Sequence, residues 1–242
     1  MLKIKQVSKN FGGIKALDEC SLEIEKGKVT AIIGPNGSGK TTLFNTISKL
    51  YVSDKGKIYL NNEDITNLKD FQISKKGISR TFQEVRLFKN LTIREHMDIA
   101  LSRKNEGLIE NLISGNENNT KKINEILKLV GLNKPLSTYA SDLSYGQRKL
   151  LDLAIAIAKP HSLLMLDEPV AGVNPQLRKE INKIIKELNK KGETILLIEH
   201  DMNFVMDLAD YIFVMDAGMV IADGKPAEIQ RNKKVLDAYL GD

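Results

Sequence analysis

Residues 29–41 read Val29-Thr30-Ala31-Ile32-Ile33-Gly34-Pro35-Asn36-Gly37-Ser38-Gly39-Lys40-Thr41. An apolar run of strand length leads directly into the pattern G-x-x-x-x-G-K-T, which in a strand–loop–helix setting is typical of a phosphate-binding loop. Glycines let backbone N–H groups turn toward phosphate oxygens, and the helix that follows points the positive end of its dipole at the same anion. The stretch therefore predicts a nucleotide site at the end of a buried strand.

The motif gives its lysine and threonine separate roles. We expect the Lys40 ammonium to reach the β- and γ-phosphates and the Thr41 hydroxyl to ligate Mg²⁺. The expected nucleotide-binding residues of this segment are Gly34, Pro35, Asn36, Gly37, Ser38, Gly39, Lys40, Thr41 and Thr42. The alternative, a glycine-rich turn with a stray lysine, does not account for the buried strand before it.

The bulk composition is that of an ordinary globular protein. The chain has 242 residues, 42% hydrophobic and 28% charged, which suits one large domain or a domain with an inserted lobe. A net charge of +5, scattered along the chain, does not by itself predict nucleic-acid binding. No apolar run reaches the ~18–20 residues that span a bilayer. We expect a cytosolic protein in which Cys20, the single cysteine, is a small buried side chain.

Periodicity places a helical middle between two strand-rich ends. Apolar residues alternate with polar ones near the N-terminus, whereas from about residue 87 to 158 they recur three and four apart. The expected strands include 29–33, 56–60, 163–166, 194–198, 211–215 and 219–222. The expected helices are 42–50, 91–103, 123–130, 150–158, 177–189 and 202–209, with a loop over 105–120. The pattern predicts a parallel α/β core with an inserted helical lobe.

Two further apolar runs end in polar residues that suit phosphate chemistry. Residues 163–166 lead into Asp167 and Glu168, and residues 195–198 lead toward His200. A carboxylate at the carboxyl end of a parallel strand beside a phosphate loop is where Mg²⁺ is held, which fits Asp167. Glu168 is the candidate general base for an attacking water, and His200 could orient that water and bond the γ-phosphate. Surface acids in a turn and a structural histidine are the alternatives.

A second glycine-containing segment, Leu143-Ser144-Tyr145-Gly146-Gln147, comes before a strongly apolar helix. Ser144 is a credible N-cap, and Gly146 permits close approach of the backbone. The segment is therefore either a simple helix cap or a second phosphate-binding helix terminus. Its distance in sequence from the first loop suggests that, if both touch one nucleotide, they come from two chains.

Together these segments resemble the ATP-binding-cassette (ABC) ATPases, and the resemblance covers the whole chain. The matching motifs are Phe11, Gly34–Thr41, Gln83 in Arg80-Thr81-Phe82-Gln83, Leu143–Gln147, Asp167-Glu168 and His200. The resemblance implies an α/β fold, namely a P-loop NTPase (RecA-like) core with an antiparallel β subdomain and an inserted α-helical subdomain. It implies a single ABC ATPase domain over 1–242, with the core at 1–86 and 159–242 and the helical subdomain at 87–158.

The resemblance also implies cofactors, partners and roles. ATP and Mg²⁺ are the implied cofactors, with Phe11 stacking on adenine. The implied metal site comprises Thr41, Gln83 and Asp167, and the implied catalytic residues are Lys40, Gln83, Glu168 and His200. Two cassettes would sandwich two ATP molecules, each supplying Ser144, Gly146 and Gln147 to the site of the other.

The same resemblance places the chain on the inner face of the cell membrane as a peripheral subunit. Its implied partners are integral-membrane permeases, which would dock near Glu84–Met97, a second and preferably paralogous cassette, and indirectly a solute-binding protein. Nucleic acid is not among them.

Additional segments narrow the resemblance to ATP-binding subunits of branched-chain amino-acid importers. They are Phe11–Leu17, Gly77–Gln83, Arg86–Phe88, Ala171–Pro175, Ile198–Met202 and Ala238–Gly241. Urea and amide importers share most of them, and lipid or lipopolysaccharide exporters and soluble cassettes are further alternatives. Tyr145 and Asn174 depart from the general pattern, which has glycine and aspartate at these positions.

Overall fold

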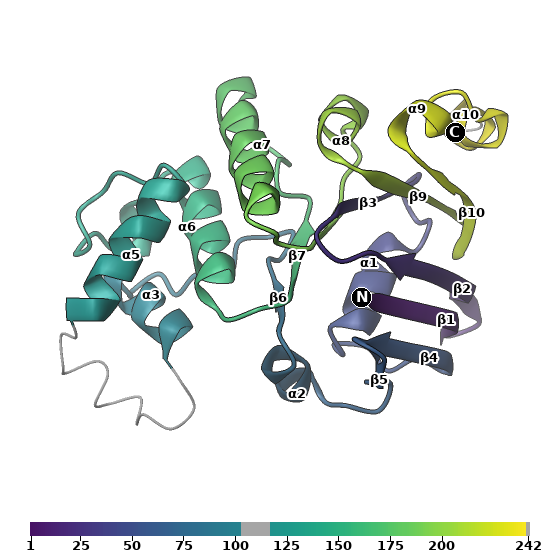
Figure 1. Cartoon of the computed structure of the whole chain (residues 1–242), viewed down its shortest axis with the longest axis horizontal. Helices are drawn as coiled ribbons and strands as arrows, with labels where there is room; N and C mark the ends of the chain where they lie inside the picture. Colours follow the sequence, from purple (N-terminus) through teal and green to yellow (C-terminus); the bar gives the residue numbers. More distant parts are fainter. Residues whose placement is uncertain (103–116, 241–242) are drawn as a thin grey trace. The chain divides into compact units, whose positions relative to one another are not determined.

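The computed structural model describes residues 1–102 and 117–240, which fold into two compact units (Figure 1). The first unit comprises Met1–Arg80, Ser162–Glu168 and the chain from Ile185 onward. The second comprises the described parts of Thr81–His161 together with Pro169–Ile184. None of the described helices is both long and apolar enough to cross a membrane.

The first unit is built on a six-stranded sheet in the order β10-β9-β3-β8-β7-β6. These strands are β3 (Val29–Ile33), β6 (Ile78–Arg80), β7 (Leu163–Asp167), β8 (Ile195–Ile198), β9 (Tyr211–Asp216) and β10 (Met219–Gly224). Every residue of β3, β7 and β8 is buried, as expected for the central strands of a parallel sheet covered on both faces. The register pairs β3 with β8 and β8 with β7, so the three carboxyl ends lie along one edge.

The edge strand β10 is an exception to the predicted parallel order. It pairs antiparallel with β9, so the prediction of a parallel core is wrong for residues 219–222. Only Ala217 and Gly218 separate the two strands, and both have positive φ angles, 44° and 82°. A two-residue connection with this geometry makes a hairpin, because a parallel pairing needs a crossover of a dozen or more residues.

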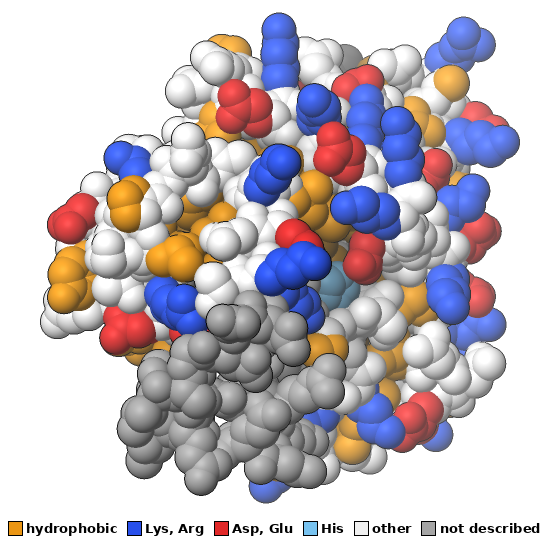
Figure 2. Space-filling model, turned by 60° about the vertical axis from the view of Figure 1, so that its left-hand side comes forward, with side chains coloured by type: hydrophobic (Ala, Val, Ile, Leu, Met, Phe, Trp, Pro, Cys, Tyr) orange, Lys and Arg blue, Asp and Glu red, His pale blue; other side chains and the backbone are white. Residues whose placement is uncertain are grey.

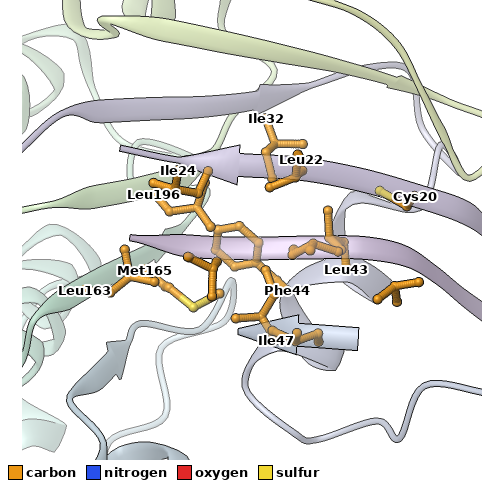
Figure 3. Packing of buried hydrophobic residues seen from close by; sticks show 14 of the residues in the cluster. Cys20, Leu22, Ile24, Ile32, Leu43, Phe44, Ile47, Leu163, Met165 and Leu196 are labelled. Carbon is orange, nitrogen blue, oxygen red and sulfur yellow. The ribbon is translucent and has the colours of Figure 1, made fainter. Parts of the chain in front are cut away.

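A second, antiparallel sheet completes the first unit, in the order β2-β1-β4-β5. Its strands are β1 (Leu2–Phe11), β2 (Ile14–Ile24), β4 (Lys55–Leu60) and β5 (Glu63–Asp64). Helix α1 (Lys40–Ile47) buries Leu43, Phe44 and Ile47, and Figure 3 shows the Phe44 ring among apolar side chains from strands of both sheets. Cys20 is buried in the same core, as predicted, and burial raises the pKa of its thiol to about 12.

Four short helices complete the described part of the first unit, and one longer helix is shared with the second unit. They are α2 (Asp70–Lys75), α8 (Met202–Leu208), α9 (Pro226–Ile229) and α10 (Lys233–Leu240), and α7 (Pro175–Lys190) continues from the second unit into the first. On the face drawn in Figure 2, basic and acidic side chains are interspersed, as the scattered lysines of the sequence suggest.

The described part of the second unit is helical. It contains α3 (Ile93–Leu101), α5 (Glu117–Leu129), the 3₁₀ turn η1 (Ala140–Asp142) and α6 (Tyr145–Ala158). Helix α3 begins later than predicted because the Thr92 side chain caps it, accepting a hydrogen bond from the Glu95 N–H.

The predicted loop over 105–120 lies mostly outside the described residues. Residues 117–120 form the first turn of α5, so the loop prediction is wrong for them. The buried side chains of Ile123, Ile126 and Leu127 further along α5 anchor the helix, and this packing outweighs the low helix propensity of its asparagines.

Candidate nucleotide site

The loop after β3 has a backbone that only glycine allows at two positions. Gly34 has a φ of 149°, and a Cβ atom there would lie 2.0 Å from the Met215 carbonyl oxygen. Gly39 has a φ of 99°, and a Cβ atom there would lie 2.4 Å from the Ala16 carbonyl oxygen. Gly39 is the N-cap of α1 and makes no side-chain cap, so the helix begins at the loop without a capping side chain from that position. Such a terminus favours an anion.

The Lys40 ammonium lies within this loop. Its Nζ donates hydrogen bonds to the carbonyl oxygens of Gly34 and Pro35, both at 2.8 Å, and to the Ser38 hydroxyl at 3.4 Å. Burial lowers the pKa of Lys40, and the Coulombic attraction of Glu168 opposes that shift. The loop therefore brings a buried cation and the N-terminus of α1 to one place, where both attract phosphate.

Asp167 ends β7 and forms a buried ion pair that the sequence did not reveal. Its Oδ2 lies 2.7 Å from an Arg80 guanidinium nitrogen, and both side chains are almost fully buried. The same guanidinium donates to Asn45 Oδ1 at 2.8 Å and to Ser48 Oγ at 2.7 Å, both on or next to α1. Arg80 thus orients the carboxylate that we predict as a metal ligand, a supporting contact of the kind that metal sites require.

Glu168 follows Asp167 in an unusual backbone conformation. Its φ is 46°, in the left-handed region that costs a non-glycine residue on the order of 1–2 kcal/mol. Its N–H donates to the Ile198 carbonyl oxygen at 3.0 Å, which holds it beside the end of β8. His200 lies just beyond β8, with its Nδ1 4.0 Å from Glu168 Oε2 and its side chain 62% exposed. The Glu168 carboxylate therefore lies close to the exposed histidine.

Phe11, the predicted adenine contact, ends β1 with 41% of its surface exposed. The Tyr51 ring meets it edge-on, with ring centroids 5.1 Å apart, and the Lys9 ammonium lies 5.3 Å from its centroid. Lys9 is in turn paired with Asp54 at 3.0 Å. The sequence analysis did not predict that Tyr51 packs against Phe11, although it is an aromatic residue shortly after α1. The contacts leave a large part of the Phe11 ring available to solvent or a ligand.

The predicted residues of the Leu143–Gln147 segment lie at the start of α6, in the second unit. Ser144 is the N-cap, as predicted. Its hydroxyl accepts from the Gln147 N–H at 3.3 Å, and its own N–H donates to Gln147 Oε1 at 3.0 Å. A Cβ atom on Gly146 would lie 2.7 Å from Leu177 Cδ2, so glycine lets the first turn approach α7 closely. The reciprocal cap gives Gln147 a structural contact that the sequence analysis did not anticipate.

Gln83 also lies in the second unit, where two buried charged residues of α6 hold its segment. The Lys149 ammonium donates to the Gln83 carbonyl oxygen at 3.1 Å, and the Asp152 carboxylate accepts from the Phe82 N–H. Burial raises the pKa of Asp152 to about 6, with Lys149, Lys159 and the Phe82 N–H acting in the opposite direction. These contacts were missed because the sequence analysis began the apolar helix at Leu150.

The raised pKa of Asp152 predicts a pH-dependent stability. Because the folded-state pKa, about 6, exceeds the ordinary value of 3.8, the folded chain binds more protons between these pH values. The contribution of Asp152 to the free energy of unfolding is therefore largest below about pH 4 and falls by about 2–3 kcal/mol as pH rises past 6. Urea unfolding from pH 4 to 7.5 should show wild type losing stability relative to Asp152→Asn. A difference that does not change with pH would contradict the prediction.

The first unit therefore gathers, at one edge of its parallel sheet, an anion-binding loop, a buried ammonium, a carboxylate pair and a histidine. The predicted residues Gln83, Ser144, Gly146 and Gln147 belong to the second unit. This chemistry suits binding of a phosphate chain and transfer of a phosphoryl group to water.

Comparison with known families agrees with this chemistry. The sequence model of a family described as ABC transporter matches residues 17–171. The chain belongs to the ABC transporter ATP-binding family. A second family, described as branched-chain amino acid ATP-binding cassette transporter, matches residues 219–242 of this ABC cassette.

Curated relatives match the cassette over its whole length. It is 40% identical to a probable branched-chain amino acid transport ATP-binding protein LivG of Archaeoglobus fulgidus, covering 100% of this chain and 95% of the relative. It is 37% identical to the high-affinity branched-chain amino acid transport ATP-binding protein LivG of Escherichia coli, covering 100% and 98%. These matches confirm the resemblance predicted from the sequence.

Solved structures of ABC cassettes share the fold, which confirms the predicted fold class. An ABC transporter cassette in its ADP conformation is 35% identical, with a TM-score of 0.86 over 100% of this chain and 99% of that chain. A dimeric cassette bound to ADP and Pi is 28% identical, with a TM-score of 0.83 over 93% and 99%.

Proposed function

We propose that the chain is the ATP-hydrolysing subunit of an ABC importer for branched-chain amino acids. The observation that carries the proposal is the edge of the parallel sheet where Lys40, Asp167, Glu168 and His200 meet the phosphate-binding loop. Full-length similarity to LivG proteins supports the transport class.

In the proposed site the loop and α1 hold the phosphates of ATP. The Lys40 ammonium exchanges its bonds to the Gly34 and Pro35 carbonyls for the β- and γ-phosphate oxygens. The residues present fit Mg²⁺, which would neutralise phosphate charge when bound. In the first unit, the Thr41 hydroxyl and the Asp167 carboxylate are oxygen ligands of the kind that Mg²⁺ prefers, and phosphate and water oxygens would complete its coordination. The family resemblance adds Gln83 of the second unit as a further ligand. Arg80 keeps the Asp167 carboxylate oriented for that role.

Hydrolysis in this proposal depends on Glu168 and His200. The Glu168 carboxylate accepts a hydrogen bond from the attacking water, and His200 contacts the γ-phosphate and holds the water in line. The left-handed backbone of Glu168 fixes where its carboxylate points, which reduces the reorganisation needed at reaction.

The signature residues Ser144, Gly146 and Gln147 serve the ATP bound to a second cassette in this proposal. The N-terminus of α6 presents N–H groups that favour a phosphate, and the Ser144–Gln147 cap fixes its geometry. The similarity to a dimeric cassette bound to ADP and Pi supports such a pairing. Neither site would be complete until two cassettes close, which makes ATP a ligand of the interface.

A surface groove in the second unit is the proposed contact with a membrane permease. It has a volume of about 430 Å³ and is lined by Glu84, Val85, Leu87, Lys89, Ala140, Tyr145 and Arg148. Nearby on the chain, Phe88 is 68% exposed, an unusual degree for a phenylalanine. Mixed charge and apolar surface suit a short amphipathic helix of a permease. The chain would then act as a peripheral subunit at the inner face of the membrane.

Affinity capture tests the partners of this proposed assembly. Tagged Glu168→Gln protein, which is expected to retain ATP, is recovered from detergent-solubilised native membranes with ATP present and its partners are identified by mass spectrometry. Recovery of two permeases and a second cassette supports the importer. Recovery of the chain alone, or with ribosomes, contradicts the transport assignment.

The exposed Phe11 ring predicts a defined loss of nucleotide affinity. Removing a stacking surface costs about 1–3 kcal/mol, so Phe11→Ala should weaken ATP binding about 5- to 150-fold. The rate at saturating ATP should persist, because the phosphate-binding residues are unchanged. Titration calorimetry gives the affinity, and Phe71→Ala, which removes a similarly exposed ring on α2, is the control. Equal ATP affinity in Phe11→Ala and wild type would remove Phe11 from the adenine site.

A further inference from the structure

Two charged side chains are buried in α6, a helix that is otherwise largely apolar. Lys149 is 6% exposed and Asp152 is 8% exposed, and they are three residues apart, so they share one face of the helix. Burying charges is costly unless they are paired and hydrogen-bonded. An apolar pair of the same size would serve packing alone equally well, so these two residues call for a more specific explanation.

Both charged side chains form hydrogen bonds with the main chain of two consecutive residues, Phe82 and Gln83. Lys149 Nζ donates to the Gln83 carbonyl oxygen at 3.1 Å, and the Asp152 carboxylate accepts from the Phe82 N–H. The Arg86 guanidinium lies 4.4 Å from the centroid of the Phe82 ring and holds that side chain as well. A donor and an acceptor from one helix face thus fix the main chain at Phe82 and Gln83.

The attachment point lies close to the start of α6. Lys149 comes five positions after Ser144, which is a rise of about 7.5 Å along a helix. Ser144 is itself fixed by its reciprocal cap with Gln147. The start of α6 thus connects Ser144 to the Gln83 main chain through Lys149 and to the neighbouring Phe82 N–H through Asp152, all within the second unit.

We propose that Lys149 and Asp152 are positioning residues that clamp the main chain at Phe82 and Gln83 to α6, the helix that Ser144 caps. The clamp makes Gln83 and Ser144 move together, so a displacement of Gln83 at one ATP is passed to the helix end that serves the other ATP. The inference rests on the proposed function, because it uses the roles proposed there for Gln83 and Ser144.

A double-mutant cycle tests the clamp in the purified full-length chain. ATP hydrolysis and ATP affinity are measured for wild type, Lys149→Met, Gln83→Ala and the double variant. Lys149→Met keeps the apolar stem and removes the donor, and it should lower kcat about tenfold while ATP affinity changes less than about twofold. In the Gln83→Ala background the same change should have an effect of less than about twofold, because the clamp still holds the main chain there but the side-chain amide that it positions is missing. Lys149→Arg should restore most of the rate, and Lys122→Met, an exposed lysine on α5, is the control.

Each outcome separates the clamp from the function on which it rests. Equal losses from Lys149→Met in both backgrounds, or no loss in wild type, would overturn the clamp and leave the ATPase intact. A Gln83→Ala variant with the wild-type rate would instead refute the proposed role of Gln83. If Lys149→Met does not fold, Asp152→Leu, which has a similar size and no acceptor for the Phe82 N–H, enters the same cycle. A rate loss confined to the background that contains Gln83 supports the clamp, and equal losses in both backgrounds or no loss in either overturn it.

Discussion

Replacing Glu168 with glutamine should lower the rate of ATP hydrolysis by about 10²–10⁴-fold, the usual contribution of a general base. The substitution keeps the size and shape of the side chain, so the left-handed backbone at this position has the same cost in both proteins. Glutamine cannot accept a proton from water, whereas the phosphate-binding loop and Lys40 are untouched. We therefore expect a variant that binds ATP with wild-type affinity and accumulates as a nucleotide-bound dimer.

Three measurements define this result. Phosphate release gives the rate, calorimetry gives the affinity, and size-exclusion chromatography with ATP gives the oligomeric state. Glu125→Gln, which changes an exposed glutamate on α5, should behave as wild type. Normal turnover by Glu168→Gln would remove Glu168 as the base and shift attention to His200, whose Nδ1 lies 4.0 Å from it.

Replacing Lys40 with alanine should weaken ATP binding by about two to four orders of magnitude. A hydrogen bond between charged groups contributes about 1.5–3 kcal/mol, and Lys40 is expected to contact two phosphates. Turnover at physiological ATP should therefore be lost. The loss should not come from unfolding, because the hydrogen bonds that Lys40 makes to described residues join it to oxygens of its own loop.

Two controls distinguish loss of phosphate binding in Lys40→Ala from loss of the fold or of any lysine. The melting temperature without nucleotide should stay close to that of wild type, and Lys26→Ala, at an exposed lysine in the turn before β3, should bind ATP normally. A Lys40→Ala variant with wild-type affinity and rate would refute the assignment of the loop as the phosphate site.

The sequence predicted the central strands of the fold correctly because each is a short apolar run. Val29–Ile33, Leu163–Leu166 and Ile195–Ile198 all lie in the parallel sheet, and each leads toward a predicted functional residue. The edge hairpin β9–β10 was assigned wrongly because an apolar run does not reveal the direction of its neighbour. The two-residue turn at Ala217 and Gly218 was the available signal.

Contacts between side chains far apart in sequence could not be predicted from the chain alone. The Arg80–Asp167 ion pair depends on β6 lying beside β7, which is a property of strand order. The contacts of Lys149 and Asp152 with the Gln83 segment depend on how α6 packs. A lysine and an aspartate three residues apart in an apolar helix were nevertheless a warning, because buried charges need partners.

Uptake of radiolabelled leucine tests the central claim most directly. Cells that lack this chain are complemented with either wild type or Glu168→Gln, expressed at equal levels, and the initial rate of leucine uptake is measured at low concentration. We expect wild type to restore uptake and Glu168→Gln to leave it at the level of uncomplemented cells. Equal uptake in all three strains would contradict the account.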